Sequence, residues 1–496
     1  MSKYYLLIIL FFSLIISELN DKLIFVMTHF RHGARSPSII NGVDNIGERW
    51  EFDSELTGVG ERMLYLLGLR NRLRYIKEYK FLSEKYNVNE LLIISSNRKR
   101  TVVSLSSYLQ GLYPQSEKLG NNLTEVQLKN GNPPVNVSNP RIEKEKNELK
   151  NNSLPNSMTL IPFETLDIEN INICIRSSNY SRKILSVSLI QNEFNEKYKD
   201  YINKFKESNN TNYAIRQINS ICEPFIANYI DGRNMSNLTN IGINKDEFYK
   251  FCLKSFNVSF GEASIYTFED ELIYIRGNYY MGLLVNYTKM AIDQDLGKNI
   301  SSVSKIPKTL LISGHDNTVS KHEIFLIFAF GKTFEFYRYP TFASQIAFEI
   351  KRKDDNKTNR NYSDYFINYY FNDELLINMT VTEFLNKVEP HIWTDQEIND
   401  YCNYDNSKNK NKTKEENNTD NQNSDEINNK TFKYFIPKNN KNHTTPLIIF
   451  TTLFGISILG NIFLIVLLTR KNTDKNIATS VQRNYENSNS YKGLKI

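Results

Sequence analysis

Short apolar runs recur along this chain, with helical stretches between them. Residues 23–28, 91–94 and 309–314 are runs of this kind, and glycine, proline or polar residues end each one. Apolar runs of about four to eight residues that stop at such signals are typical of strands buried on both faces. Strands that alternate with helical stretches predict an α/β fold built on a doubly wound sheet.

The pattern changes in three other parts of the chain. Residues 115–300 are polar and helix-prone, and they predict an inserted, mainly helical lobe beside the sheet. Residues 403–444 lose the apolar period and become rich in Asn, Lys, Glu and Asp, so we expect a disordered stalk there. Residues 447–468 form a long apolar run, which predicts one transmembrane helix.

The two ends predict how the chain is oriented in a membrane. Residues 1–17 combine Lys3, an apolar stretch and Ser17, as a secretory signal peptide does. Arg470 and Lys471 follow the predicted transmembrane helix directly, and such positive charges favour the cytosolic side. We therefore expect a type I membrane protein whose folded region is lumenal or extracellular.

The predicted cytosolic tail, residues 469–496, carries Tyr491 in a Tyr-Lys-Gly-Leu segment. This segment resembles the Tyr-x-x-apolar signals that sorting adaptors bind. Residence in lysosomes or endosomes is therefore one prediction, and the cell surface is its alternative.

Composition narrows the classes of partner. The 496 residues carry a formal charge of +6 that is spread through Lys-rich stretches, without an aromatic and basic pattern, so nucleic-acid binding is not expected. The sequence leaves the oligomeric state open, a homodimer included. Numerous N-x-S/T sequons predict a glycoprotein.

The four cysteines of the chain all lie between the predicted signal peptide and the predicted transmembrane helix, as expected in a compartment where disulfides form. They are Cys174, Cys222, Cys252 and Cys402, and four cysteines allow three sets of disulfide pairs.

Candidate chemistry begins where the first predicted strand ends. His32 lies between Arg31 and Arg35, at the edge where open α/β sheets bind ligands. A guanidinium group presents a planar fork of donors that matches phosphate oxygens, and an unprotonated imidazole nitrogen can attack phosphorus. The segment therefore predicts a phosphate site with a histidine nucleophile.

Residues 30–37 resemble the RHGxRxP signature of the histidine acid phosphatases, the phosphomonoester-hydrolysing branch of the phosphoglycerate-mutase-like superfamily. Three further segments match that family's motifs in the same order. They are Leu56–Gly60 (LT-x-x-G), Ser95–Thr101 with the later Gly-Leu-Tyr-Pro, and His315–Thr318 (HD-x-T). The resemblance covers roughly residues 22–402. The architecture is closest to membrane-anchored lysosomal or prostatic-type acid phosphatases.

The resemblance implies a role for each motif residue. His32 is the expected nucleophile, and Asp316 the expected proton donor to the leaving group. Arg31, Arg35, Arg100 and His315 are the expected phosphate-binding residues, with no metal or other cofactor. If the pKa of Asp316 stays near its ordinary value of about 4, an acidic pH optimum follows.

Several assignments rest on the family pattern alone. Arg98 competes with Arg100 for the third arginine position, but Thr101 fixes the register in favour of Arg100. Ser96 and Asn97 replace the usual Thr and Asp, and a histidine, His29, stands where an apolar residue is usual. The family's bridge between the central region and the end of the catalytic domain implies Cys174–Cys402, which leaves Cys222–Cys252.

The remaining histidines have structural interpretations. We expect His29 to be packed or hydrogen-bonded, His322 to lie on a helix face, and His391 and His443 to lie in exposed loops. Substrates are expected to be small-molecule or protein phosphomonoesters. The alternatives are a phytase-like inositol-polyphosphate phosphatase and a membrane glycoprotein that binds without turnover.

Overall fold

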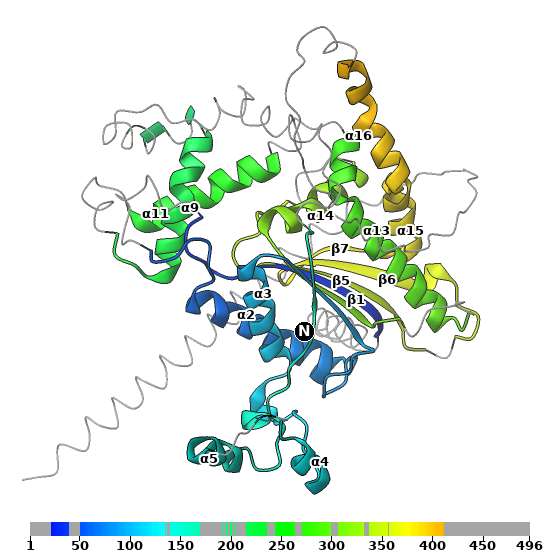
Figure 1. Ribbon diagram of the computed structural model, residues 1–496. Helices are drawn as coiled ribbons and strands as arrows, with labels where there is room; N and C mark the ends of the chain where they lie inside the picture. The colour runs from blue at the N-terminus through cyan, green and yellow to red at the C-terminus, as the bar shows by residue number, and fades with distance from the viewer. Residues whose placement is uncertain are drawn as a thin grey trace, which may run out of the picture. The chain divides into compact units, whose positions relative to one another are not determined.

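The computed structural model in Figure 1 describes most of residues 21–410. The described ranges are 21–38, 50–133, 135, 139–168, 215–235, 244–262, 270–298, 306–331, 337–355 and 357–410, with six single positions between 192 and 203. The predicted signal peptide, transmembrane helix and cytosolic tail lie outside these ranges. Within them, no helix combines the length and apolar character that crossing a bilayer requires.

Seven described strands form one mixed sheet in the order β3-β2-β4-β1-β5-β6-β7. The first four are parallel to one another, and the last three add antiparallel partners. The predicted strands are thereby confirmed as the three neighbours β2, β4 and β1. The bounds are β1 (Asp21–Arg31), β2 (Leu91–Ser96), β3 (Glu164–Leu166), β4 (Thr309–Gly314), β5 (Gln345–Lys353), β6 (Tyr365–Phe371) and β7 (Glu374–Thr380).

Helices cover both faces of the sheet because successive residues of its central strands point to opposite sides. Phe25, Met27 and Leu310 belong to a core shared with α13, α14 and α15. Val26 and Leu311 belong to a second core shared with α2 and α3. The predicted α/β class is confirmed (Figure 1). These helices are α2 (Gly58–Asn71), α3 (Lys99–Leu112), α13 (Asp270–Asp295), α14 (Asp316–Ala329) and α15 (Val381–Val388).

The described part of the region from 115 to 300 is mainly helical, but it is not all a separate lobe. Its strand β3 joins the sheet beside β2, and α13 packs on the sheet, with 14 of its 26 residues buried. The predicted boundary was wrong at α13 because tyrosines and an interior Gly and Asn mask its apolar faces in the sequence. The other helices are α4 (Glu125–Asn130), α5 (Pro140–Leu149), α9 (Ile215–Asp231) and α11 (Lys245–Asn257).

Short helical turns join several of these elements. Two have π-helical hydrogen bonding, η1 (Arg72–Glu78) and η4 (Val258–Glu262). The 3-10 turns are η2 (Gln115–Glu117), η3 (Pro155–Ser157), η6 (Tyr362–Asp364) and η7 (Glu389–His391).

A disulfide between Cys222 and Cys252 joins α9 to α11, with the Cα atoms 5.1 Å apart. Phe225 and Phe248 pack edge to face beside it, with ring centroids 4.7 Å apart. This is one of the two pairings that the family resemblance implies. Cys402 is also disulfide-bonded, but Cys174 lies outside the described residues, so their pairing stays a prediction.

One predicted boundary and one predicted residue position need correction near the end of the described chain. Helix α16 (Asp395–Lys410) continues beyond residue 403, where we expected a disordered stalk to begin. His391 is not in an exposed loop, because its ring stacks on Tyr274 at a centroid distance of 4.1 Å. Apolar periodicity predicts neither feature. Helix α16 consists mostly of polar residues, and the contact of His391 with Tyr274 is between two rings far apart in the sequence.

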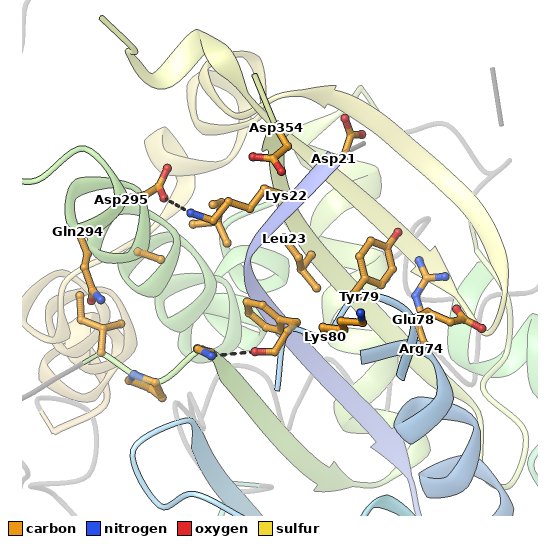
Figure 2. Close-up of a pocket in the computed structure, with 16 residues that line it drawn as sticks. Asp21, Lys22, Leu23, Arg74, Glu78, Tyr79, Lys80, Gln294, Asp295 and Asp354 are labelled. Carbon is orange, nitrogen blue, oxygen red and sulfur yellow. Dashed lines mark hydrogen bonds and ion pairs between the residues drawn. The ribbon is translucent and has the colours of Figure 1, made fainter. Parts of the chain in front are cut away.

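A hollow of about 1190 Å³ lies at the amino end of β1 (Figure 2). Its lining includes charged side chains that neighbouring groups neutralise: Lys22 pairs with Asp295, and Lys308 pairs with Glu90. The matched motifs lie at the opposite, carboxyl ends of the strands. The hollow therefore does not include the predicted phosphate site.

Two buried histidines connect β1 to α14. His29 and His322 share a hydrogen bond of 2.8 Å between Nδ1 and Nε2, which confirms structural roles for both. Nε2 of His29 also lies 3.2 Å from the Thr318 hydroxyl. Burial, with the neighbouring charge of Lys321, lowers the pKa of His322 to about 3. Burial, followed by the proximity of His322, holds the pKa of His29 well below its usual range.

This pair predicts a loss of stability in acid. Both histidines are neutral in the folded chain and regain ordinary pKa values on unfolding, so the unfolded chain binds more protons below about pH 6.5. Stability is full above that pH and falls as the pH decreases toward the folded values. For His322 the free energy of unfolding should drop by about 2 kcal/mol between pH 7 and pH 5.

Denaturant unfolding of the His322→Gln variant at both pH values measures this contribution. Glutamine keeps hydrogen-bonding capacity but cannot titrate, so the acid-dependent loss should shrink relative to the parent chain. His391→Gln, at a half-buried position, is the matched control and should change the loss less. An equal pH dependence in the parent and in His322→Gln would contradict the assignment.

Candidate functional site

The matched motifs converge because three parallel strands end at the same edge of the sheet. Arg31 at the end of β1 pairs in register with Gly314 at the end of β4, and Ser95 of β2 pairs with Ser313 of β4. His32 directly follows Arg31, and His315 directly follows Gly314. Their rings face each other with centroids 5.3 Å apart. This arrangement follows from parallel pairing, since parallel strands present their carboxyl ends together.

A tight contact between two glycines holds the loop after β1. A Cβ atom on Gly33 would overlap the backbone of Gly60, which lies at the start of α2. The backbone N–H of His32 donates to the carbonyl of Gly314 at 2.9 Å, and that of Gly33 donates to the Ser104 hydroxyl at 3.1 Å. The loop therefore has little freedom, and His32 is fixed against β4.

The His32 ring is buried and has a defined tautomer. Its Nδ1 lies 2.8 Å from the carbonyl oxygen of Gly33, which can only accept, so Nδ1 carries the proton. Burial, followed by the charges of Arg31 and Arg35, holds the pKa of His32 well below its usual range. The ring is therefore neutral, and its Nε2 keeps a lone pair available for reaction.

Arg31 is held on several sides. Its Nη1 donates to the carbonyl of Pro340 at 2.8 Å and to the Tyr339 hydroxyl at 3.2 Å, and Nη2 lies 2.9 Å from Oδ2 of Asp316. The Phe342 ring lies 4.4 Å from the guanidinium carbon. In the described part of the chain, the buried Nε has no hydrogen-bond partner. An anion in the site would satisfy that donor.

Arg35 is neutralised by a residue of the inserted region. Its Nη1 lies 2.7 Å from Oε1 of Glu223 in α9, and the backbone and hydroxyl of Ser38 both donate to the same oxygen at 2.8 Å. Among the described residues, its buried Nε also has no hydrogen-bond partner. The motif analysis missed Glu223, whose only sequence signal is its place beside Cys222.

Arg100 and His315 contact each other at the third strand end. Arg100 donates from Nη2 to Nδ1 of His315 at 3.1 Å, because a guanidinium group cannot accept. Nε2 of His315 then carries the proton and donates to the Ser96 hydroxyl at 2.8 Å. Ser96, a departure from the family pattern, thus keeps a hydrogen-bonding role, and it also contacts Thr101 at 2.8 Å.

Asp316 is the first residue of α14, and the contacts of its carboxylate favour the ionised form. Oδ1 accepts from the backbone N–H of Asn317 at 2.8 Å, and Oδ2 accepts from Tyr339 at 3.0 Å and from Arg31. Burial opposes ionisation, but the Arg31 charge and the Asn317 hydrogen bond outweigh it, and the pKa of Asp316 is lowered. In this structure Asp316 is therefore a carboxylate.

The site contains three guanidinium groups and two carboxylates around a neutral imidazole. This arrangement suits a small dianion with its reacting atom close to Nε2 of His32. Within the described residues, no three His, Cys, Asp or Glu side chains are grouped as metal ligands. Sequence reasoning placed the six motif residues here but missed Glu223 and Tyr339, which lie outside any motif.

Comparison with known families places this site in context. The model of the histidine phosphatase superfamily (branch 2) matches residues 22–372. A putative acid phosphatase of Caenorhabditis elegans is 40% identical over 100 residues, which cover 19% of this chain and 22% of the relative. Lysosomal acid phosphatase of Xenopus laevis is 37% identical over 111 residues, covering 22% and 25%, and human prostatic acid phosphatase is 39% identical over 110 residues, covering 22% and 28%.

The matched segments thus span only about a quarter of each relative's length. Among solved structures, a Hafnia alvei phytase in complex with myo-inositol hexakis sulphate superposes with a TM-score of 0.46 at 14% identity, covering 71% of this chain and 84% of the phytase. The family model itself covers well over half of the chain. The chain therefore belongs to the histidine phosphatase superfamily, branch 2.

Proposed function

We propose that this chain is an acid phosphatase that hydrolyses phosphate monoesters through a phosphohistidine on His32. One observation carries the proposal: His32 is neutral, its Nδ1 is committed to Gly33, and its Nε2 is available between the arginines of the motif. A nucleophile must be unprotonated to attack, and this environment keeps it so even in mild acid.

The arginines supply the binding energy and the transition-state stabilisation. Arg31, Arg35 and Arg100 carry three positive charges, against the two negative charges of Asp316 and Glu223. The buried Nε donors of Arg31 and Arg35 are in place before substrate arrives. Such preorganised donors stabilise the charge that spreads over the phosphoryl oxygens during transfer. Once Arg100 turns toward the phosphate, Nδ1 of His315 is proposed to take up a proton and to donate a further hydrogen bond to a phosphoryl oxygen.

Asp316 must gain a proton before it can act as the acid. A bound phosphate dianion competes for Arg31 and repels the carboxylate, and both effects raise the pKa of Asp316 above its value in the empty site. The protonated acid then donates to the departing oxygen, and the resulting carboxylate accepts a proton from the water that hydrolyses the phosphohistidine. Because the starting pKa is already low, activity should be greatest in acid.

The place of the enzyme in the cell is a further part of the proposal. Residues 1–17 and 447–468 would direct and anchor a type I membrane protein, with the residues between α16 and 447 as a spacer and Tyr491 available to a sorting adaptor. One matched relative is a lysosomal acid phosphatase, which favours lysosomal over surface residence. Labelling of intact cells with a membrane-impermeant biotin reagent tests this: a large labelled fraction at steady state would favour the surface instead.

Replacing His32 with Ala should abolish phosphoenzyme formation, because no other described side chain at the strand ends places an unprotonated nitrogen where Nε2 of His32 lies. Turnover of para-nitrophenyl phosphate between pH 3 and pH 9, with acid quench of a radiolabelled phosphomonoester, measures both steps. His391→Ala is a matched control that should keep wild-type activity. A folded parent chain without any turnover would instead favour the binding-module alternative.

Replacing Asp316 with Asn should slow hydrolysis according to the leaving group. An amide cannot donate the required proton, so alkyl phosphates should lose at least about a hundredfold in the rate of phosphoenzyme formation, as expected for removal of a general acid. Para-nitrophenyl phosphate should lose much less in this step, because its leaving group departs without protonation. Rapid-quench measurement of phosphoenzyme formation with both substrates decides, and equal losses would refute the role of Asp316 as acid.

A further inference from the structure

The hydroxyl of Tyr339 lies between the catalytic acid and a phosphate-binding arginine. It is 3.0 Å from Oδ2 of Asp316 and 3.2 Å from Nη1 of Arg31. Resting on the function proposed above, we infer that Tyr339 is a positioning residue that favours the ionised form of Asp316 and fixes its orientation, both in the empty site and with a phosphate group bound.

The direction of both hydrogen bonds follows from the chemistry of the partners. A guanidinium group can only donate, so Arg31 donates to the phenol oxygen. An ionised carboxylate can only accept, so the phenol proton points to Oδ2 of Asp316. Oδ1 is already engaged by the backbone N–H of Asn317. Oδ2 accepts from both Arg31 and Tyr339. When a phosphate draws Arg31 away, Oδ2 is the oxygen that loses a donor and can take the catalytic proton, and Tyr339 still donates to it.

The Tyr339 ring is fixed by the inserted region and not by the phosphate site. It stacks on Phe256 with centroids 5.3 Å apart and lies 5.6 Å from Phe260, while its backbone N–H donates to Oδ1 of Asn257 at 3.2 Å. These contacts come from α11 and η4. A substrate phosphate can draw Arg31 away from Asp316, but it does not remove the contacts that hold Tyr339 in place.

Tyr339 therefore has a different effect from Arg31. Arg31 stabilises the carboxylate only while the site is empty, whereas Tyr339 continues to donate after the dianion binds. Its hydrogen bond favours the carboxylate, and so it opposes protonation of Asp316 in both states. The hydrogen bond from Tyr339 therefore narrows the acidic range in which the chain is active, and it also keeps Oδ2 of Asp316 in one orientation. This couples the packing of the inserted region to the pH dependence of the reaction.

The Tyr339→Phe variant tests the inference, because phenylalanine keeps the ring packing and removes only the hydroxyl. The basic limb of the pH profile of kcat/KM for an alkyl phosphate, whose leaving group needs the proton of Asp316, should move to higher pH by about one unit, as expected for losing one hydrogen bond to a charged group. Tyr337→Phe is the matched control. That tyrosine lies two residues earlier, is buried, and contacts Ser320 at 3.3 Å, so its loss should leave the midpoint unchanged.

A binding measurement separates this inference from the proposed function, since it needs no turnover. Sulfate is a dianion that does not titrate between pH 4 and pH 8, and calorimetry with the full-length chain gives its affinity at each pH. Affinity should fall as Asp316 ionises, and Asp316→Asn should remove that fall. In Tyr339→Phe the fall should occur at higher pH by about one unit.

The possible outcomes are distinct. An unshifted sulfate profile in a folded Tyr339→Phe variant, or a uniform loss of kcat with an unchanged pH midpoint, would overturn the positioning role. An equal shift in Tyr337→Phe would show that packing of the segment, and not the hydroxyl, is responsible. A chain that binds sulfate with the predicted shift but never turns over would retain the Tyr339 assignment and refute the proposed enzyme.

Discussion

The parallel pairing of β1 with β4, and of β4 with β2, is the constraint on which the site depends. It brings three chain segments that are far apart in sequence to one edge of the sheet. A shift of one residue in either pairing would turn His32 or His315 to the other face of the sheet. Buried side chains on both faces of these strands oppose such a shift, since apolar groups would then be exchanged between the two cores.

Convergence of the strand ends creates an electrostatic problem that the surrounding residues solve. Three guanidinium groups lie close together in a largely buried site, and without partners they would repel one another at a high cost. Asp316 neutralises Arg31, Glu223 neutralises Arg35, and the lone pair of His315 accepts from Arg100. Asp316 and His315 are neighbours at the start of α14, whereas Glu223 comes from α9 of the inserted region. The inserted region therefore contributes to the charge balance of the site as well as to its surroundings.

The sequence was sufficient to predict the central strands and the motif residues, because their signals are local. Apolar runs identify β1, β2 and β4, and the motifs follow each of them directly. The antiparallel strands β5 to β7 and the burial of α13 were not predicted, since their apolar residues alternate with polar ones or with tyrosines. Glu223 and Tyr339 were not found either. Their roles depend on distances to Arg35 and Asp316 that only the folded chain defines.

Arg31 has opposite consequences for the two groups on either side of it. Its positive charge helps to keep His32 unprotonated, as the proposed role of nucleophile requires, and it also keeps Asp316 ionised, which is the opposite of what the proposed role of acid requires. An empty site is therefore prepared for attack on phosphorus but not for protonation of the leaving group. A phosphate dianion changes this balance, because it attracts the guanidinium and repels the carboxylate. The bound dianion would also favour protonation of His32. Burial and the hydrogen bond of Nδ1 to Gly33 oppose that protonation, so Nε2 can still attack phosphorus. In the proposed mechanism, substrate binding thus completes the catalytic arrangement, and Asp316 gains its proton only when there is a leaving group to receive it.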